Sequence, residues 1–204
     1  MKNFGWAIIA AMFCATGASA QGRSGMSTSS PLTNVRPYVE LQGFGECLAR
    51  TQRKQALALI ATAPDSADED KLLKKYVYGE HSTCMFGGTE MAMPNLFARG
   101  VIAEGLLKNE GVPEAYRLTS PLPAEVRDLH GVARCYTSGH RGEVAQLLKT
   151  QPGSREEVQA VAALWEGFRT CMPNFKVRLN APWIRFLLAQ ALLRLPPEAA
   201  AEVR

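Results

Sequence analysis

The stretch TAPDSADEDKLL, residues 62–73, returns 88 positions later as TQPGSREEVQAV, residues 150–161. Both stretches contain the pattern Pro-x-Ser-x-x-Glu, and a short segment rich in Leu and Ala, KQALALIA or GEVAQLLK, precedes each of them. Self-similarity at a fixed distance is typical of a duplicated structural unit. The repeated phrase therefore indicates how the whole chain is organised.

The repeat extends well beyond this phrase. At the offset of 88 residues the matched pairs include Cys47 with Cys135, Arg53 with Arg141 and Leu59 with Leu147. The offset falls to 87 at the next cysteine pair and to 86 between the segments VIAEGLL and LLAQALL, and loops between packed elements tolerate such changes. We interpret residues 36–111 and 123–195 as two diverged copies of one unit, with a linker at 112–122 and a tail at 196–204.

The repeated phrase has the chemistry of a helix start. A serine at the N-cap accepts a hydrogen bond from the backbone N–H three residues on, and a glutamate at that position reaches back to the serine's own N–H. Ser66 with Glu69, and Ser154 with Glu157, fit this capping box. The alternative, a serine nucleophile, lacks a histidine or lysine partner at any recognisable position.

Each copy reads as four helices. The first contains an early cysteine, the short Leu- and Ala-rich segment forms the second, the capping phrase starts the third, and an apolar fourth helix follows a break of glycines and prolines. The sequence therefore predicts an all-α protein of two similar four-helix units in tandem.

The first twenty residues, MKNFGWAIIAAMFCATGASA, have a basic start, a short apolar centre and small residues at Ala18 and Ala20. This pattern predicts a secretory signal peptide, residues 1–20, cleaved after Ala20. An uncleaved anchor is the alternative, but the apolar centre is shorter than the roughly 20 residues that span a bilayer. No later segment resembles a transmembrane helix. We expect a periplasmic or secreted protein with a disordered lead, rich in Ser, Gly and Thr, at residues 21–35.

Removal of the signal leaves four cysteines, which permit three pairings. Duplication of a unit duplicates its internal bond, so the simplest pairing joins Cys47 to Cys84 and Cys135 to Cys171. A crossed pairing would require the two units to interlock. Each unit is thus expected to contain one disulfide.

The charge balance argues against nucleic acid as a partner. The formal net charge is +4, and loss of Lys2 with the signal reduces it to +3. Basic and acidic residues are also interleaved rather than gathered in blocks of one sign.

Three histidines are the first candidates for chemistry. His81 and Cys84 have the spacing H-x-x-C, but the second pair of ligands that zinc needs is missing. His130 and His140 have glutamines, Gln42 and Gln52, at the matching positions of the first copy. We therefore expect exposed helix histidines and no metal site.

Other candidate sites are equally weak. FGG at residues 86–88 lacks the Gly-Lys-Ser/Thr that completes a phosphate-binding loop. Glu40, Glu46 and Glu104 are expected on solvated helix faces. The aromatic residues of the second copy are expected to form its core, with an exposed ligand-holding surface as the alternative; they are Trp165, Phe168, Phe175 and Trp183. No catalytic, cofactor-binding or metal-ligating residue is predicted.

The unit C-x5-R-x5-L-[IL]-x3-P-x-S-x-x-E, with a second cysteine and an amphipathic Leu- and Ala-rich helix after it, resembles a group of exported tandem-repeat helical proteins from sphingomonad-type alphaproteobacteria. The resemblance covers residues 37–195. It implies a periplasmic or secreted setting and supplies no activity, cofactor or catalytic residue.

From the sequence we expect a non-catalytic structural or binding module of the bacterial envelope. Its partner would be another envelope protein or a peptide, held in a groove or on an outer face between helices. The alternative is a periplasmic hydrolase, whose active site would gather a histidine with a carboxylate or serine. A third role, as an envelope stress factor without a fixed ligand, also stays open, as does the oligomeric state.

Overall fold

The computed structural model describes residues 25–26, 35–78, 84, 93–109, 126, 128–172 and 177–195. The expected signal peptide, the linker, the FGG segment, His81 and Phe175 lie outside these residues. The described part confirms the all-α prediction, with eight helices. They are α1 (Arg36–Thr51), α2 (Arg53–Ala61), α3 (Ala67–Tyr76), α4 (Asn95–Lys108), α5 (Leu129–Gly139), α6 (Arg141–Lys149), α7 (Arg155–Thr170) and α8 (Ala181–Arg194).

Two very short strands accompany the helices, and the sequence did not lead us to expect them. β1 (Gly25–Met26) pairs in parallel with β2 (Arg178–Leu179), with Gly25 opposite Arg178 and Met26 opposite Leu179. The pairing brings a short piece of the chain ahead of α1 against the segment that leads into α8.

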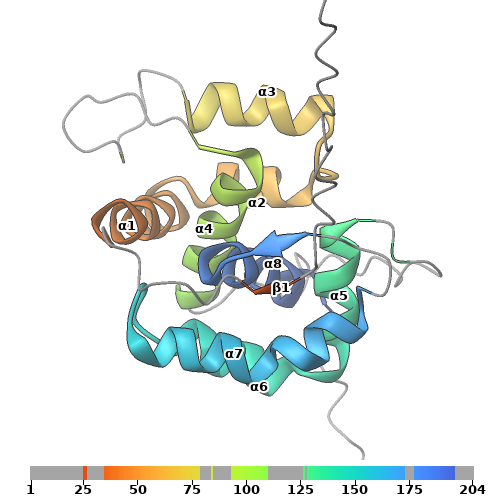
Figure 1. Cartoon of the computed structure of the whole chain (residues 1–204). Helices are drawn as coiled ribbons and strands as arrows, with labels where there is room; N and C mark the ends of the chain where they lie inside the picture. The colour runs from red at the N-terminus through yellow and green to blue at the C-terminus, as the bar shows by residue number, and fades with distance from the viewer. Residues whose placement is uncertain are drawn as a thin grey trace, which may run out of the picture.

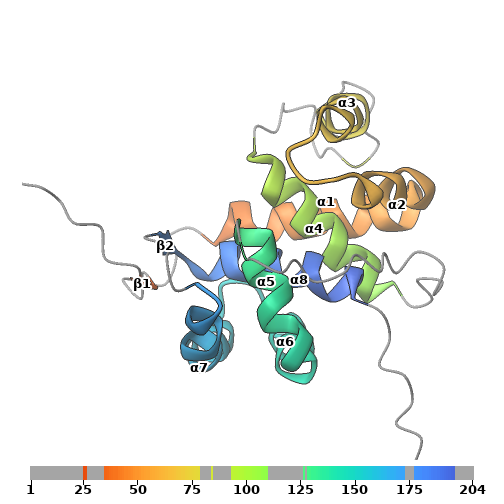
Figure 2. The ribbon, with the colours of Figure 1, turned by 90° about the vertical axis from the view of Figure 1, so that its right-hand side faces the viewer.

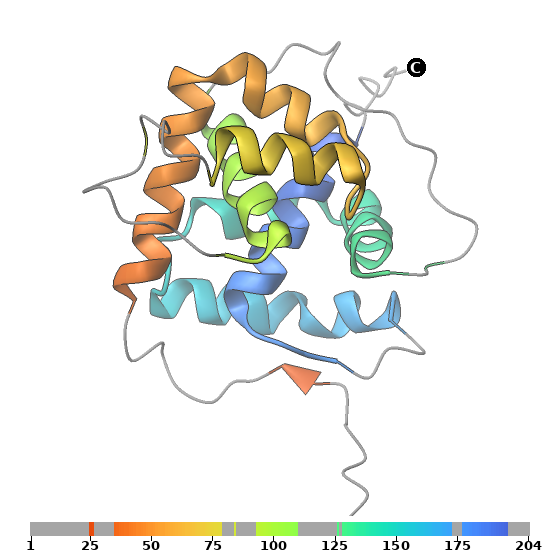
Figure 3. The same ribbon diagram turned by 90° about the horizontal axis from the view of Figure 1, so that it is seen from above.

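Helices α4 and α8 form the centre of the molecule. They pack against each other, with α1 against α4 and α5 against α8. Figures 1 and 2 show α3 on one side of this central pair and α6 and α7 on the other, and Figure 3 shows α1 and α5 flanking it. Residues 98–106 of α4 and 184–191 of α8 are buried without interruption. Both helices are mainly apolar and have no exposed polar face, as expected for helices surrounded by others, and the few polar residues in these stretches are buried with them.

Glycines allow the closest helix contacts. A Cβ atom on Gly105 of α4 would lie 2.5 Å from the carbonyl oxygen of Gly45 in α1. A Cβ atom on Gly100 would lie 2.2 Å from the Cβ of Phe186 in α8. Any larger residue at these positions would push the helices apart, so glycine sets the distance of α4 from both neighbours.

The repeated phrase starts α3 and α7. Ser66 Oγ accepts a hydrogen bond from Glu69 N at 3.2 Å, and Ser154 Oγ accepts one from Glu157 N at 3.1 Å. The carboxylates differ from the expectation, because each accepts at 2.6 Å from the N–H of the residue before the serine, not from that of the serine itself.

Backbone conformation explains this difference. The residue before each serine, Asp65 or Gly153, has a positive φ, 57° and 72° respectively. This left-handed turn directs its N–H toward the first turn of the helix, where the carboxylate lies.

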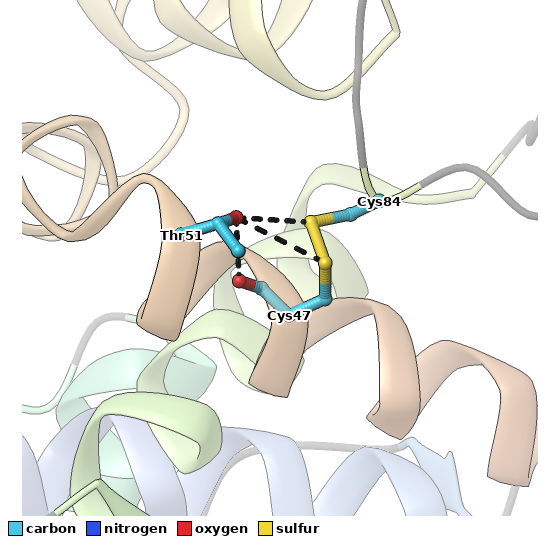
Figure 4. The surroundings of a disulfide bond; sticks show 3 residues. All are labelled: Cys47, Thr51 and Cys84. Carbon is cyan, nitrogen blue, oxygen red and sulfur yellow. Dashed lines mark hydrogen bonds between the residues drawn. A yellow bond between two sulfur atoms is a disulfide. The ribbon is translucent and has the colours of Figure 1, made fainter.

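The predicted disulfides, Cys47–Cys84 and Cys135–Cys171, are confirmed. Figure 4 shows the first, with Thr51 Oγ1 donating to the carbonyl oxygen of Cys47 at 2.8 Å and lying 3.4 Å from Cys84 Sγ. Disulfides persist in oxidising compartments, so they indicate an extracytoplasmic location. None of the described helices is long and apolar enough to span a bilayer.

The aromatic residues of the second half are only partly in its core. Trp165 and Phe168 are buried in α7, with ring centroids 6.1 Å apart. Trp183 is half-buried and packs edge-on against Phe97 of α4, at 4.9 Å. It therefore belongs to the contact between α4 and α8.

Candidate functional site: two arginine clusters beside the central helices

Two arginines lie in the middle of the central helices, Arg99 in α4 and Arg185 in α8. Their exposed fractions are 1% and 0%. Burial of a guanidinium group is strongly unfavourable unless acceptors surround it. Both arginines are fully surrounded, and each organises a cluster of polar residues.

We define the Arg99 cluster as Arg99, Thr62, Glu69, His130, Arg134, Gln190 and Arg194. We define the Arg185 cluster as Arg185, Tyr38, Gln42, Glu46, Glu104, Lys108, Thr150 and Glu157.

Arg99 joins α4 to the end of α2 and the start of α3. Its Nη1 donates to Glu69 Oε1 at 3.0 Å, to Thr62 Oγ1 at 2.9 Å and to the carbonyl oxygen of Leu59 at 3.0 Å. Its Nη2 donates to the carbonyl oxygens of Ile60 and Thr62, both at 3.2 Å. The capping glutamate thus also serves as the counter-ion of a buried arginine.

Arg185 does the same in the second half. Its Nη1 donates to Glu157 Oε1 and to Thr150 Oγ1, both at 3.0 Å. Its Nη2 donates to the carbonyl oxygens of Leu148 at 2.9 Å and Thr150 at 3.1 Å. These acceptors stand 88 residues after Glu69, Thr62 and Ile60, and Arg185 stands 86 residues after Arg99.

Each guanidinium group also forms hydrogen bonds, through its Nε edge, to a residue in the other half of the chain. Arg185 binds Glu104 of α4 through Nε–Oε2 at 3.0 Å and Nη2–Oε1 at 2.6 Å. Arg99 Nε donates to Gln190 Oε1 of α8 at 3.3 Å. Gln190 stands 86 residues after Glu104. An amide therefore occupies the place that a carboxylate occupies in the other cluster.

At a second pair of corresponding positions, too, the Arg185 cluster has a carboxylate that the Arg99 cluster lacks. Glu46 binds Lys108 Nζ at 2.6 Å in the Arg185 cluster, and Lys108 also lies 3.2 Å from Glu104. The corresponding residues at offsets of 88 and 86 are Arg134 and Arg194. An ion pair in one cluster thus has two cations as its counterpart in the other.

The charges of the clusters are consequently opposite. In the Arg185 cluster two cations, Arg185 and Lys108, meet three carboxylates. In the Arg99 cluster three guanidinium groups meet one carboxylate, Glu69. Arg194 donates from Nη2 to the carbonyl oxygens of Ile60 at 3.2 Å and Thr62 at 2.8 Å, so it lies beside Arg99 on the same acceptors.

The pKa values follow this difference. Burial, followed by the charges of Arg99 and Arg134, lowers the pKa of Arg194 to about 10. Burial, followed by the charge of Arg99, lowers the pKa of His130 to about 4, so His130 is neutral at pH 7. Burial also acts to lower the pKa of Arg185, but the hydrogen bonds and charge of Glu104 raise it above its usual value.

The Arg185 cluster also contains a buried phenol and an amide. Tyr38 in α1 donates its hydroxyl hydrogen to Glu157, and Gln42 Nε2 donates to Glu104 Oε2 at 2.9 Å. Burial, followed by the negative charge of Glu157, raises the pKa of Tyr38. This cluster is a closed network in which both buried carboxylates have several donors.

The structure corrects two expectations about exposed residues. Glu104, expected on a solvated face, is buried and paired with Arg185. His130, expected to be exposed, is half-buried. Glu40 agrees with the expectation, since it is exposed and pairs with Arg36 at 2.8 Å. One signal for the buried pair was available: a charged residue inside the apolar segment WIRFLLAQALL must be buried and must have a partner.

The other described histidine, His140, lies at the surface with a carboxylate. Its ring stacks on Tyr136 with centroids 4.3 Å apart, and its Nδ1 lies 3.1 Å from Glu143 Oε1. Tyr136 donates to Glu143 Oε2 at 2.5 Å. No group of three metal-ligating side chains occurs among the described residues.

Comparisons with protein-family models, with curated proteins and with solved structures find no match for this chain. The function must therefore be argued from the residues and their geometry.

Proposed function

We propose that the chain is an exported, non-catalytic helical protein of two tandem four-helix units that acts as a structural or protein- or peptide-binding module of the bacterial envelope. One observation carries this proposal: the capping glutamate of each half is committed to a buried arginine from the fourth helix of the same half. Carboxylates that would otherwise be candidates for acid–base chemistry hold the scaffold together.

The helix boundaries support the tandem arrangement. Helices α2 and α6 both have nine residues and start 88 positions apart, and α4 and α8 both have 14 residues and start 86 positions apart. Each half also has one disulfide, from its first helix to the end of its third or just beyond it. Duplication of one ancestral unit accounts for all of these correspondences.

The envelope setting is supported by the disulfides, by the secretory pattern of the first twenty residues and by the resemblance to exported proteins of sphingomonad-type alphaproteobacteria. Cell fractionation under non-reducing conditions tests it. We expect the protein in the periplasm or medium, with a mature N-terminus at Gln21. Reduced protein in the cytoplasm would contradict the proposal.

Site-specific photo-crosslinking tests the binding role. Val39 in α1 and Val158 in α7 are exposed by 49% and 37%, and they are the large apolar side chains most exposed in the described part. A photoreactive residue at either position should give one discrete adduct in intact cells, and the same probe at Lys71, an exposed polar position in α3, serves as the control. Absence of a discrete adduct from both valines would contradict a binding role.

A hydrolase is the second candidate, and only the His140–Glu143 pair favours it. A carboxylate that orients a histidine is one part of a nucleophile-activating arrangement, but the described partners of His140 include no serine or cysteine. Assay of the purified protein on ester and peptide substrates tests this alternative. Turnover that the substitution His140→Gln abolishes would favour the enzyme over the binding module.

A further inference from the structure

The Arg99 cluster contains hydrogen-bond donors that lack acceptors. Arg134 Nε and Arg194 Nε are buried and have no hydrogen-bond partner among the described residues. An unsatisfied buried donor is unfavourable, and more so when the group is charged. Native structures rarely leave such groups without a partner, which is a protein group, an ordered water, an ion or a ligand.

The cluster also has too few carboxylates for its cations. Among the residues that the structure describes, Glu69 is the only buried carboxylate of the cluster, and Arg99 already binds it. Asp65 and Asp128 are close enough to influence His130, but both are exposed, and neither makes a described hydrogen bond to an arginine of the cluster. Asp128 instead caps α5 by accepting from Gly131 N at 2.6 Å.

The Arg185 cluster shows which group would complete the Arg99 cluster. At the positions that correspond to Arg134 and Gln190 it has Glu46 and Glu104, and both are carboxylates bound to cations. A guanidinium group also matches a carboxylate in planar geometry, through paired N–H donors. A carboxylate is therefore the anion for which the surroundings are built.

Part of the cluster lies at the protein surface. His130, Arg134 and Arg194 are half-buried, unlike Arg99. Their helices, α5 and α8, pack side by side (Figure 3). Arg134 of α5 and Arg194 of α8 are therefore the cations of the cluster that a group at the protein surface can contact.

We propose that the Arg99 cluster is a binding site for a carboxylate group, with Arg134 and Arg194 as its direct contacts. Arg99 keeps its own acceptors, and its buried positive charge adds to the positive potential at the site. The ligand is either a small free carboxylate or an acidic side chain of a peptide, since both present the same group. This inference does not depend on the proposed envelope role.

Calorimetric titration and thermal unfolding of the disulfide-intact protein test the site. The probes are glutarate, the capped peptide Gly-Glu-Glu-Gly and inorganic phosphate, each at constant ionic strength against sodium chloride. We expect saturable binding of glutarate or the peptide, with a rise in Tm. The substitution Arg134→Gln should weaken that binding at least tenfold, and Arg134→Glu should abolish it, because the new carboxylate occupies the site.

The controls separate this site from general effects of salt. Glu46→Gln changes the corresponding position of the other cluster and should leave binding unchanged. Binding of glutarate without the peptide identifies a free small carboxylate as the ligand, and tighter binding of the peptide identifies an acidic segment. No saturable binding to the wild type, equal binding to Arg134→Glu, or a preference for phosphate over both carboxylates would overturn the proposal.

Discussion

The two arginine clusters share one frame and differ in charge. In each, an arginine from the fourth helix of a half binds a capping glutamate, a threonine and backbone carbonyl oxygens of the same half. The remaining residues carry a net negative charge around Arg185 and a net positive charge around Arg99. The part that both clusters share is the arginine with the acceptors of its own half. The residues that the other half contributes differ between the two clusters.

This difference indicates a division of labour between the halves. The Arg185 cluster is satisfied by its own residues and ties α1, α4, α7 and α8 together. The Arg99 cluster has donors left over, which costs stability. These donors are the groups that we propose to bind a carboxylate.

The largest expected effect comes from removal of the buried arginines. Arg185→Met leaves Glu157 buried without its cation and Glu104 with Lys108 alone, and loss of one partner of a buried pair destabilises by about 3–5 kcal/mol. Arg99→Met should cost less, because it strands only Glu69 and relieves repulsion with Arg134 and Arg194. Urea unfolding at pH 7 measures both, and the milder pair Arg185→Lys and Arg99→Lys serves if a methionine variant does not fold. An equal loss of unfolding free energy in Arg99→Met and Arg185→Met would contradict the difference in charge balance between the two clusters.

Removal of each disulfide in turn tests whether the two halves depend equally on their disulfides for stability. The two bonds span 37 and 36 residues. In the chain-entropy estimate each stabilises by about 4 kcal/mol. We expect the double substitutions Cys47→Ala/Cys84→Ala and Cys135→Ala/Cys171→Ala to lower the free energy of unfolding by similar amounts. A much larger loss from one of them would show that one half depends on its bond more than the other.

The pH dependence of stability should reveal His130. Its pKa is about 4 in the folded protein and 6.5 ordinarily, so between these values the unfolded chain binds a proton that the folded chain does not. Stability should therefore fall as the pH decreases from 6.5 to 4. Each pKa unit corresponds to about 1.4 kcal/mol, and for this half-buried group we expect a loss of about 2 kcal/mol.

His130→Gln, which copies Gln42 of the other cluster, should remove that part of the pH dependence. Urea unfolding at pH 4, 5, 6 and 7 measures it, with His140→Gln as the control for loss of a histidine. An unchanged pH profile in His130→Gln would place His130 outside the influence of the arginines.

The sequence predicted the elements that depend on local chemistry. Ser66 and Ser154 mark helix starts because an N-cap needs only the next turn, and the interpretation of the sequence as two copies of one unit favoured one disulfide pairing of three. The partners of Arg99 and Arg185 could not be predicted in this way. Their acceptors come from α2–α4 and α6–α8 and from the turns after α2 and α6. The choice of Glu104 or Gln190 depends on how α4 crosses α8, which helical periodicity does not determine. Glu69 and Glu157 were predicted to bind the N–H of the serine, and each instead binds the N–H of the residue before it. Their second role, as counter-ions, required the fold.

The most direct test of this account is a charge exchange between the clusters. Arg134→Glu gives the Arg99 cluster the carboxylate that Glu46 supplies to the other, and Glu46→Arg makes the reverse change. Measured by urea unfolding in a buffer free of carboxylates, Arg134→Glu should raise the free energy of unfolding by about 0.5–1 kcal/mol, the range of a partly exposed ion pair, and Glu46→Arg should lower it by a similar amount. A decrease in stability for Arg134→Glu would contradict the claim that the Arg99 cluster lacks a carboxylate.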